Sequence, residues 1–248
     1  MRVLLFALVF ASCTWTPARA QTDAPPRLRV DLPLEGSLTA GAVVLLALSE
    51  TLFKDALSPD ACRWCEPPGF DAAVRDALHW ERTRPAEIAS AVTGFVLAPV
   101  AAYGGLALAA HNADRLALWP HDALIVTESV ALTMFVTAAV KGLVGRRRPI
   151  AHFRGGGLEI GSAQEANLSF FSGHSSLSFS LATASATVAS LRGDRAAPWL
   201  WAGGLLNATL TGWLRIAADA HYLSDVLTGA LVGTLLGVGL PWLRVRLE

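Results

Sequence analysis

Long apolar segments dominate the pattern of hydrophobic and polar residues along the chain. Five of them, each close to the roughly 17–25 residues that cross a bilayer as a helix, cover residues 86–110, 122–144, 172–191, 198–215 and 225–243. The sequence lacks the alternation over about ten residues that marks the strands of a membrane β-barrel. Hydrogen bonds within helices must therefore satisfy the backbone N–H and C=O groups in lipid. The pattern predicts an all-α, membrane-embedded bundle of five to six long helices.

The region before these segments is less regular. Residues 37–57 predict a helix, but its apolar core, residues 40–48, is too short to cross a bilayer comfortably. Glu50, Lys54 and Asp55 follow this core at once. We therefore expect the first helix not to cross.

A short amphipathic helix is predicted between the first helix and the long segments. Phe70, Val74, Ala77 and Leu78 share one side of it, while charged residues occupy the other. We expect this helix to lie at the membrane interface.

The composition agrees with a membrane location. Of the 248 residues, 53% are hydrophobic and 16% are charged, whereas about 25% are charged in soluble domains. The mean hydropathy is +0.44. Because the formal net charge is +0, nothing indicates nucleic acid as a partner, which would require a basic face.

Residues 1–20 have the three parts of a secretory signal peptide. Arg2 supplies the basic start, residues 3–11 are apolar, and residues 16–20 end in an Ala-x-Ala cleavage site. An uncleaved anchor is the alternative. Residues 21–69 would then form a periplasmic lead-in and the first helix.

Two cysteines, Cys62 and Cys65, remain after such a cleavage. Outside the cytosol a pair of this kind can close a small disulfide, although the ring is short. A zinc site would need further ligands, which His79 alone does not supply. The sequence leaves the disulfide open and predicts no metal here.

Two features inside the long segments indicate helix packing. Gly229, Gly233 and Gly237 recur every four residues, so a neighbouring helix can approach this stripe closely. Glu128 lies deep in the segment 122–144. Because carboxylates inside a membrane rarely stay unpaired, we expect Glu128 to make a buried polar contact between helices.

Lys141 and Arg148 bring positive charge to the end of the segment 122–144. They are seven positions apart, so both project from one side before Pro149 stops the helix. Arginines at this place can simply anchor a helix end at the headgroups. Lys141, however, lies inside the apolar stretch, where a charge is costly and indicates function. The pair therefore predicts an anion site.

A second cluster begins the segment 172–191. Ser172, Gly173 and His174 stand where free N–H groups and the helix dipole attract an anion. A histidine at such a place can donate a proton to a leaving oxygen. A capping serine followed by a surface histidine is the simpler alternative.

A third cluster, Arg215, His221 and Asp225, occupies the turn between the last two segments. His221 and Asp225 are four residues apart and therefore neighbours on a helix face. The carboxylate can hold one imidazole nitrogen and leave the other to attack as a nucleophile, although an interfacial His–Asp pair explains the spacing equally well. Counting segment ends puts all three clusters on one side of the membrane, so they can share one pocket.

Together the three clusters resemble the signature of the type 2 phosphatidic acid phosphatase and vanadium haloperoxidase superfamily. That signature reads Lys-x6-Arg-Pro, Pro-Ser-Gly-His and Ser-Arg-x5-His-x3-Asp, and this chain has KGLVGRRRP from Lys141, FSGH from Phe171 and LRIAADAHYLSD from Leu214. The similarity covers residues 70–243. Phe171 replaces a proline and Leu214 replaces a serine, whereas every charged or proton-transferring position is kept.

The resemblance implies a role for each matching residue. Three cations and a helix N-terminus would bind a phosphate: Lys141, Arg148, Arg215, Ser172 and Gly173. His221 would attack phosphorus to form a phosphohistidine, Asp225 would orient it, and His174 would protonate the departing alcohol. Fixed cations can stabilise the transferring group as a metal otherwise would, so no metal or other cofactor is expected. We expect further contacts at the pocket rim or the lipid headgroups from Arg146, Arg147, His152 and Arg154.

The implied protein is an integral-membrane, metal-independent phosphohydrolase with its phosphatase domain in residues 70–248. Its expected partners are the lipid bilayer and a lipid phosphomonoester or pyrophosphate, such as phosphatidate, phosphatidylglycerophosphate, undecaprenyl pyrophosphate or a lipid A phosphate. A vanadate-dependent haloperoxidase is one alternative, disfavoured because such oxidases are typically soluble. A non-catalytic lipid-binding or scaffold protein is the other.

The side on which the site opens depends on residues 37–57. If they do not cross, five crossings after a cleaved leader place the site in the periplasm of a bacterial-type inner membrane. Four arginines then lie inside, as the positive-inside rule favours: Arg192, Arg195, Arg244 and Arg246. If residues 37–57 do cross, the site faces the cytoplasm. We expect the periplasmic arrangement.

Overall fold

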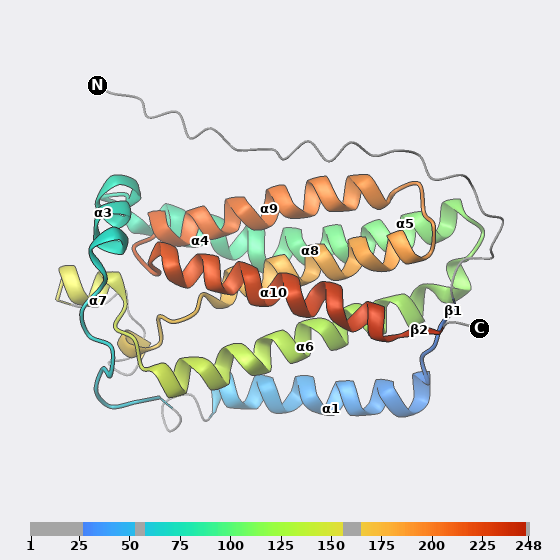
Figure 1. The fold of residues 1–248 in the computed structure, drawn as a ribbon, viewed down its shortest axis with the longest axis horizontal. Helices are drawn as coiled ribbons and strands as arrows, with labels where there is room; N and C mark the ends of the chain where they lie inside the picture. The colour runs from blue at the N-terminus through green and yellow to red at the C-terminus, as the bar shows by residue number, and fades with distance from the viewer. Residues whose placement is uncertain (1–26, 53–57, 156–164, 247–248) are drawn as a thin grey trace.

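The computed structural model describes residues 27–52, 58–155 and 165–246, and its long helices lie side by side along one axis (Figure 1). Within these residues six long rods form the bundle. Five of the rods are single α-helices: α1 (Leu32–Thr51), α6 (Trp119–Val144), α8 (Gly173–Leu191), α9 (Ala197–Ala217) and α10 (Leu223–Leu243). The prediction of an all-α bundle of five to six long helices is confirmed.

The sixth rod, Thr83–Asn112, changes its helical winding along its length. Its parts are α4 (Thr83–Val92), the π-helical turns η1 (Thr93–Leu97) and η2 (Val100–Gly104), and α5 (Gly105–Asn112). Wider π-helical turns often occur at functional sites. The shorter elements are β1 (Arg27–Leu28), α3 (Gly69–Leu78), η3 (Leu116–Leu118), α7 (Pro149–Phe153), η4 (Glu165–Asn167) and β2 (Val245–Arg246), with β1 and β2 paired antiparallel.

Four of the rods are long and apolar enough to cross a membrane: Leu32–Ser49, Thr83–Asn112, Leu116–Val144 and Leu223–Leu243. The first of these contradicts the expectation that the apolar part of residues 37–57 is too short to cross a bilayer. α1 begins at Leu32, where Asp31 caps it by accepting a bond from the Leu34 N–H, and its 20 residues reach about 30 Å. The apolar residues before residue 37 supply the missing length. The signal peptide predicted for residues 1–20 lies outside the described residues.

α8 is the central helix of the bundle. Fifteen of its nineteen residues are buried, and it lies against α6, α9 and α10. Some of its hydroxyls bond to α6: Thr133 donates to Ser180 at 3.1 Å, and Thr137 and Ser176 are bonded at 3.0 Å. Protein rather than lipid surrounds α8, so it does not need the hydropathy of the outer helices.

The glycine stripe of α10 brings that helix against α8, which confirms the packing role predicted for it. A Cβ atom at Gly229 would lie 2.6 Å from the carbonyl oxygen of Ser172. A Cβ at Gly233 would strike the Ser176 carbonyl oxygen in the same way. Only glycine allows the two backbones to approach this closely.

Glu128 has the buried polar contact that the sequence predicts. Its carboxylate accepts a bond from Arg244 at 2.7 Å, and Thr39 lies 3.5 Å away. Arg244 also pairs with Glu35 at 2.9 Å, so it connects α6 to the start of α1. This ion cluster lies at the end of the bundle where α1 begins and α10 ends (Figure 1).

We predict that Gly233→Ala destabilises the protein by about 1–3 kcal/mol, because the added methyl group overpacks the α8–α10 contact. Thermal unfolding in detergent measures the change. Gly239→Ala is the matched control on the same helix, since a Cβ at Gly239 meets nothing within 4 Å. An equal loss in both variants would contradict a packing role for the stripe.

Candidate active site

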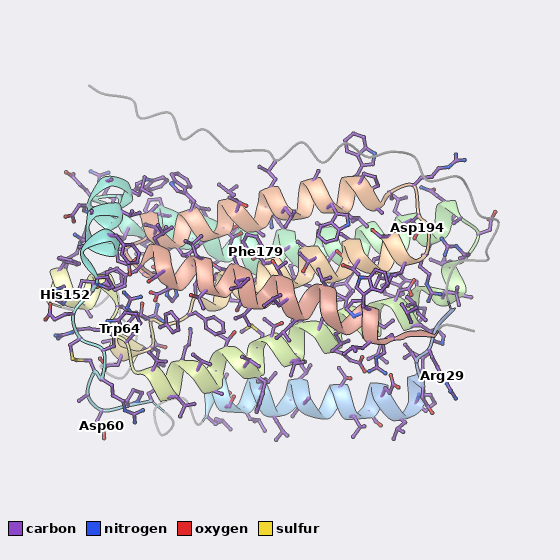
Figure 2. All side chains as sticks on the ribbon, in the orientation of Figure 1. Arg29, Asp60, Trp64, His152, Phe179 and Asp194 are labelled. Atoms are coloured by element: carbon purple, nitrogen blue, oxygen red, sulfur yellow. A yellow bond between two sulfur atoms is a disulfide. The ribbon has the colours of Figure 1, made fainter. Side chains whose placement is uncertain are left out.

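The three predicted clusters meet at one end of the bundle. There α6 ends, α7 and α8 begin, and the turn between α9 and α10 lies beside them (Figure 1). In Figure 2, Trp64 and His152 mark this end, whereas Arg29 and Asp194 mark the opposite one. Residues far apart in sequence can therefore surround one site.

Lys141 and Gly173 come together where α6 ends and α8 begins. Gly145 closes α6 with a φ of 58°, a left-handed conformation that suits glycine, and its N–H donates to the Lys141 carbonyl at 3.0 Å. A Cβ atom at Gly173 would lie 3.5 Å from the Lys141 ammonium nitrogen. The bare backbone of Gly173 thus leaves room for a cation beside the N-terminus of α8.

Arg148 and Arg215 are positioned by neighbouring oxygens. Arg148 donates from Nε to the Glu165 carbonyl at 2.9 Å and from Nη1 to the Ala220 carbonyl at 3.3 Å. Arg215 donates from Nη1 to the Ser90 hydroxyl at 3.0 Å. Within the described part of the chain, its buried Nε has no hydrogen-bond partner.

The two arginines line a polar cavity of about 120 Å³. Charged groups of both signs face it, because Glu87 from α4 and Glu165 also contribute to its wall. The remaining wall is formed by Thr83, Ile150, Ala218 and Ala220. An oxyanion can enter between the guanidinium groups, while the carboxylates oppose a second negative group.

Ser172 and His174 occupy the first turn of α8. The Ser172 hydroxyl accepts a bond from the Ser175 N–H at 3.4 Å, and the Ser172 N–H donates to the Asp225 carbonyl at 3.0 Å. The His174 ring packs edge-on against Phe95, with ring centroids 4.6 Å apart. A Cβ at Gly94 would lie 3.3 Å from this imidazole, so the π-helical turn supports the ring closely.

His221 and Asp225 face one another, although His221 lies in the turn before α10 and not on the helix face that the spacing predicts. The His221 side chain is buried, and its Nδ1 lies 3.7 Å from Asp225 Oδ2. Asp225 is held in turn by the Ser169 hydroxyl at 2.6 Å and by the Tyr222 N–H at 2.9 Å. At 3.7 Å the contact is longer than a hydrogen bond, and within the described residues the buried Nδ1 has no hydrogen-bond partner. The carboxylate can therefore orient Nδ1 through its charge and leave Nε2 as the reactive nitrogen.

Burial and three cations keep His221 neutral. Desolvation lowers the pKa of His221 well below its usual value of 6.5, and the positive charges of Arg148, Arg215 and Lys141 lower it further. The Ser169 backbone acts weakly in the opposite direction. A neutral imidazole at neutral pH is the form that can act as a nucleophile.

The three clusters therefore lie within electrostatic reach of one another. His174 interacts with Arg215, His221, Lys141 and Arg148. The structure thus brings together all eight residues of the predicted site. Among the described residues, no group of three or more His, Cys, Asp or Glu side chains is placed to hold a metal ion.

The two departures from the family signature fit their surroundings. Phe171 is buried, and its ring packs edge-on against Phe170 with centroids 6.0 Å apart. Leu214 packs in an apolar cluster with Ala86 and Ala217.

The expectation that Arg146 lies at the pocket rim is wrong, because only 1% of Arg146 is exposed and it pairs with two carboxylates. Arg147 is exposed. Arg154 lies 3.3 Å from a buried carboxylate oxygen of Asp219, and His152 lies 3.7 Å from Glu66. Of these four residues, Arg147 and Arg154 are exposed and can therefore reach lipid headgroups.

A short loop holds the end of α6 in place. Cys62 and Cys65 form a disulfide. Between them, Arg63 donates to the carbonyls of Gly142 at 3.2 Å and Leu143 at 2.7 Å. The loop thus satisfies carbonyls that the helix end leaves free, and it fixes the segment that leads to Arg148.

Several residues at this end carry no recognisable sequence signal. Ser90 and Glu87 lie on α4 before the family signature, Ser169 lies just ahead of the second motif, and Asp71 lies on α3. Each is a common polar residue, and only its burial or its partner distinguishes it. The buried position of Arg146 is equally invisible among three adjacent arginines.

We predict that the protein loses stability as the pH falls below about 6.5, the pKa of an unfolded histidine. In that range the unfolded chain binds a proton that folded His221 does not, so the loss is at most about 1.4 kcal/mol per pH unit from this group. His221→Asn should flatten the pH dependence of thermal unfolding. His111→Asn, at an exposed position near the end of α5, should retain the wild-type slope, and equal slopes in all three proteins would contradict this assignment.

A comparison with protein families agrees with this geometry. A family model described as the PAP2 superfamily matches residues 122–247, about half of the chain, and the match contains all three clusters. No curated protein and no solved structure matches the chain. The family assignment implies a phosphatase-type hydrolase and confirms the resemblance seen in the motifs. The chain belongs to the PAP2 superfamily.

Proposed function

We propose that this protein is a membrane phosphohydrolase that removes phosphate from a lipid through a phosphohistidine intermediate. The observation that carries the proposal is a buried, neutral His221 oriented by Asp225 and surrounded by three cations. A nucleophile beside fixed positive charge suits attack on a phosphate ester, whose negative charge would otherwise repel it.

The first step is attack of His221 Nε2 on phosphorus. The P–N bond forms as the P–O bond to the leaving alcohol breaks, and the imidazole becomes positively charged. Asp225 stabilises that charge through Nδ1, which lies 3.7 Å from its carboxylate in the free protein. The negative charge of the bound phosphate offsets the cations that disfavour a proton on His174 in the free protein, so His174 can carry a proton and give it to the departing oxygen.

The second step is hydrolysis of the phosphohistidine by water. His174, now neutral, accepts a proton from the water, so inorganic phosphate leaves and both histidines return to their starting states. Lys141, Arg148 and Arg215 bind the phosphoryl oxygens in both steps. The Ser172 hydroxyl and the Gly173 N–H, at the start of α8, complete this binding.

We propose a lipid phosphate as the substrate because of where the site lies. The site occupies the end of a bundle in which four rods are long and apolar enough to cross a membrane. A headgroup phosphate at the bilayer surface can enter such a site while its chains remain in the membrane. The α3 helix supports this placement, since Phe70 and Leu78 are exposed while Asp71 and Arg75 are buried.

We propose further that the site faces the oxidising side of the membrane. The Cys62–Cys65 disulfide lies at the site end, and disulfides persist outside the cytosol. α1 begins at the far end, where Glu35 pairs with Arg244. If α1 crosses, the chain before it lies on the cytoplasmic side, and residues 1–20 are then not a cleaved leader.

The purified protein should release phosphate from lipid phosphomonoesters or pyrophosphates without added metal, and His221→Ala should lower kcat by at least about 10³-fold. Phosphate release over a panel of phosphatidate, phosphatidylglycerophosphate, undecaprenyl pyrophosphate and lipid A measures both. His111→Ala, far from the site, is the matched control.

Other outcomes of this experiment separate the alternatives. Bromination with added vanadate, without phosphate release from folded protein, would favour a haloperoxidase. Phosphate release that survives His221→Ala would exclude the phosphohistidine. With an activated aryl phosphate, which needs little proton donation, His174→Ala should accumulate an acid-labile phosphoenzyme that His221→Ala lacks.

Single cysteines should reveal the membrane side. We expect Arg147→Cys, exposed at the site end, to react with a membrane-impermeant maleimide in intact cells. Arg195→Cys, exposed at the far end, should react only after lysis. The reverse labelling pattern would place the site in the cytoplasm.

A further inference from the structure

Arg146 is a buried cation held between two buried carboxylates. Its Nη2 donates to Asp71 Oδ2 at 2.7 Å, and its Nη1 donates to Asp225 Oδ1 at 2.6 Å. Both carboxylates are fully buried, and 1% of Arg146 is exposed. We call Asp71, Arg146 and Asp225 the carboxylate–arginine–carboxylate chain.

Aromatic rings fix the guanidinium group in this position. The Arg146 Cζ atom lies 3.9 Å from the Trp64 ring centroid and 4.3 Å from that of Tyr222. Trp64 belongs to the disulfide-closed loop and also pairs with Arg146 through the backbone. A planar guanidinium between two rings has little freedom to turn, so it can connect the two carboxylates only in the observed way.

Asp71 reaches the site from outside the part of the chain that carries the family signature. It lies on α3, whereas the family match begins at residue 122. Besides Arg146, it accepts bonds from the Ser224 N–H at 3.0 Å and the Ser224 hydroxyl at 2.6 Å. α3 is thereby attached to the start of α10, one residue before Asp225.

The three residues of the carboxylate–arginine–carboxylate chain together carry one net negative charge, next to Nδ1 of His221. Two carboxylates and one guanidinium leave that excess, and Asp225 presents it to Nδ1 at 3.7 Å. The charged and titratable neighbours that act on His221 most strongly are cations or a base: Lys141 from α6, Arg148 before α7, His174 from α8 and Arg215 from α9. Glu87 and Glu165 lie in the wall of the cavity that Arg148 and Arg215 line. If Asp71 were neutral, Arg146 and Asp225 would cancel each other, and no net negative charge would remain on the Nδ1 side of His221 to offset the cations.

We propose that Asp71 is a positioning residue for the reaction, acting through Arg146 and Asp225 to supply the negative charge that stabilises the His221 imidazolium formed on attack. This inference rests on the proposed function of His221 as the nucleophile. Arg146 by itself would neutralise Asp225, and Asp71 restores the charge that the nucleophile needs.

The test is the pH dependence of phosphate release in charge-altering variants. Asp71→Asn should lower kcat about tenfold or more and move the acidic limb of kcat/KM to lower pH, because losing a nearby negative charge lowers the pKa of His221. Arg146→Gln leaves two negative charges and should move the limb to higher pH. The double variant has the wild-type net charge and should return the limb toward its wild-type position.

The controls separate this charge effect from a merely structural one. Asp76→Asn lies on the same helix, with 63% of the Asp76 side chain exposed, and should leave the profile unchanged. Asp71→Glu keeps the charge and should retain the wild-type limb. If the single variants lose activity with no opposite shifts, or the double variant loses the sum of both, the proposal is overturned.

A second readout does not depend on activity. In ¹⁵N-histidine spectra at pH 7, with the His221 signals assigned by their absence in His221→Ala, wild type should carry its proton on Nδ1. Asp71→Asn should reduce that preference, and Asp76→Asn should not. Unchanged His221 signals in Asp71→Asn would refute the proposal. If wild-type protein releases no phosphate, the proposed function fails, while this comparison still decides whether Asp71 acts on His221.

Discussion

The structure depends on one constraint: three positively charged side chains must be held close together beside His221. Lys141, Arg148 and Arg215 all lower the pKa of His221, so they lie near it and near one another. Their mutual repulsion must be offset before any anion binds, because uncompensated buried charge is costly. Backbone carbonyls and the Ser90 hydroxyl hold the arginines, and the helix end places the lysine. Such preorganised charge favours an anion whose charge is spread over several oxygens.

Close packing of the helices turns this local arrangement into a rigid site. The glycine stripe lets α10 touch the backbone of α8, and that contact places Ser172 against Asp225, whose carbonyl accepts the Ser172 N–H at 3.0 Å. The hydroxyls along α8 then bond to α6, which carries Lys141 at its end. The central helix α8 therefore contacts both the helix that carries Lys141 and the start of α10 that carries Asp225.

The carboxylate–arginine–carboxylate chain extends the site into a region that is not part of the family match. α3 places the apolar Phe70 and Leu78 outward and the charged Asp71 and Arg75 inward, which reverses the usual burial of an amphipathic helix in water. At a membrane surface this orientation is favourable, since lipid covers the apolar side. The buried side is then free to pair Asp71 with Arg146 and Arg75 with Asp219, to which Arg75 Nε and Nη2 both donate at 2.7 Å.

The sequence by itself determined the helical class, the long apolar segments and the family motifs that contain the eight proposed site residues, because bilayer length and motif spacing are local properties of the chain. It misjudged α1, whose start depends on a cap at Asp31, and it placed Arg146 at the surface. Only the tertiary structure decided that Arg146 is buried, that Asp71 reaches it and that α8 is central. These facts depend on which distant side chains meet, and a buried ion pair differs from a surface charge only in its neighbours, which spacing along the chain does not record.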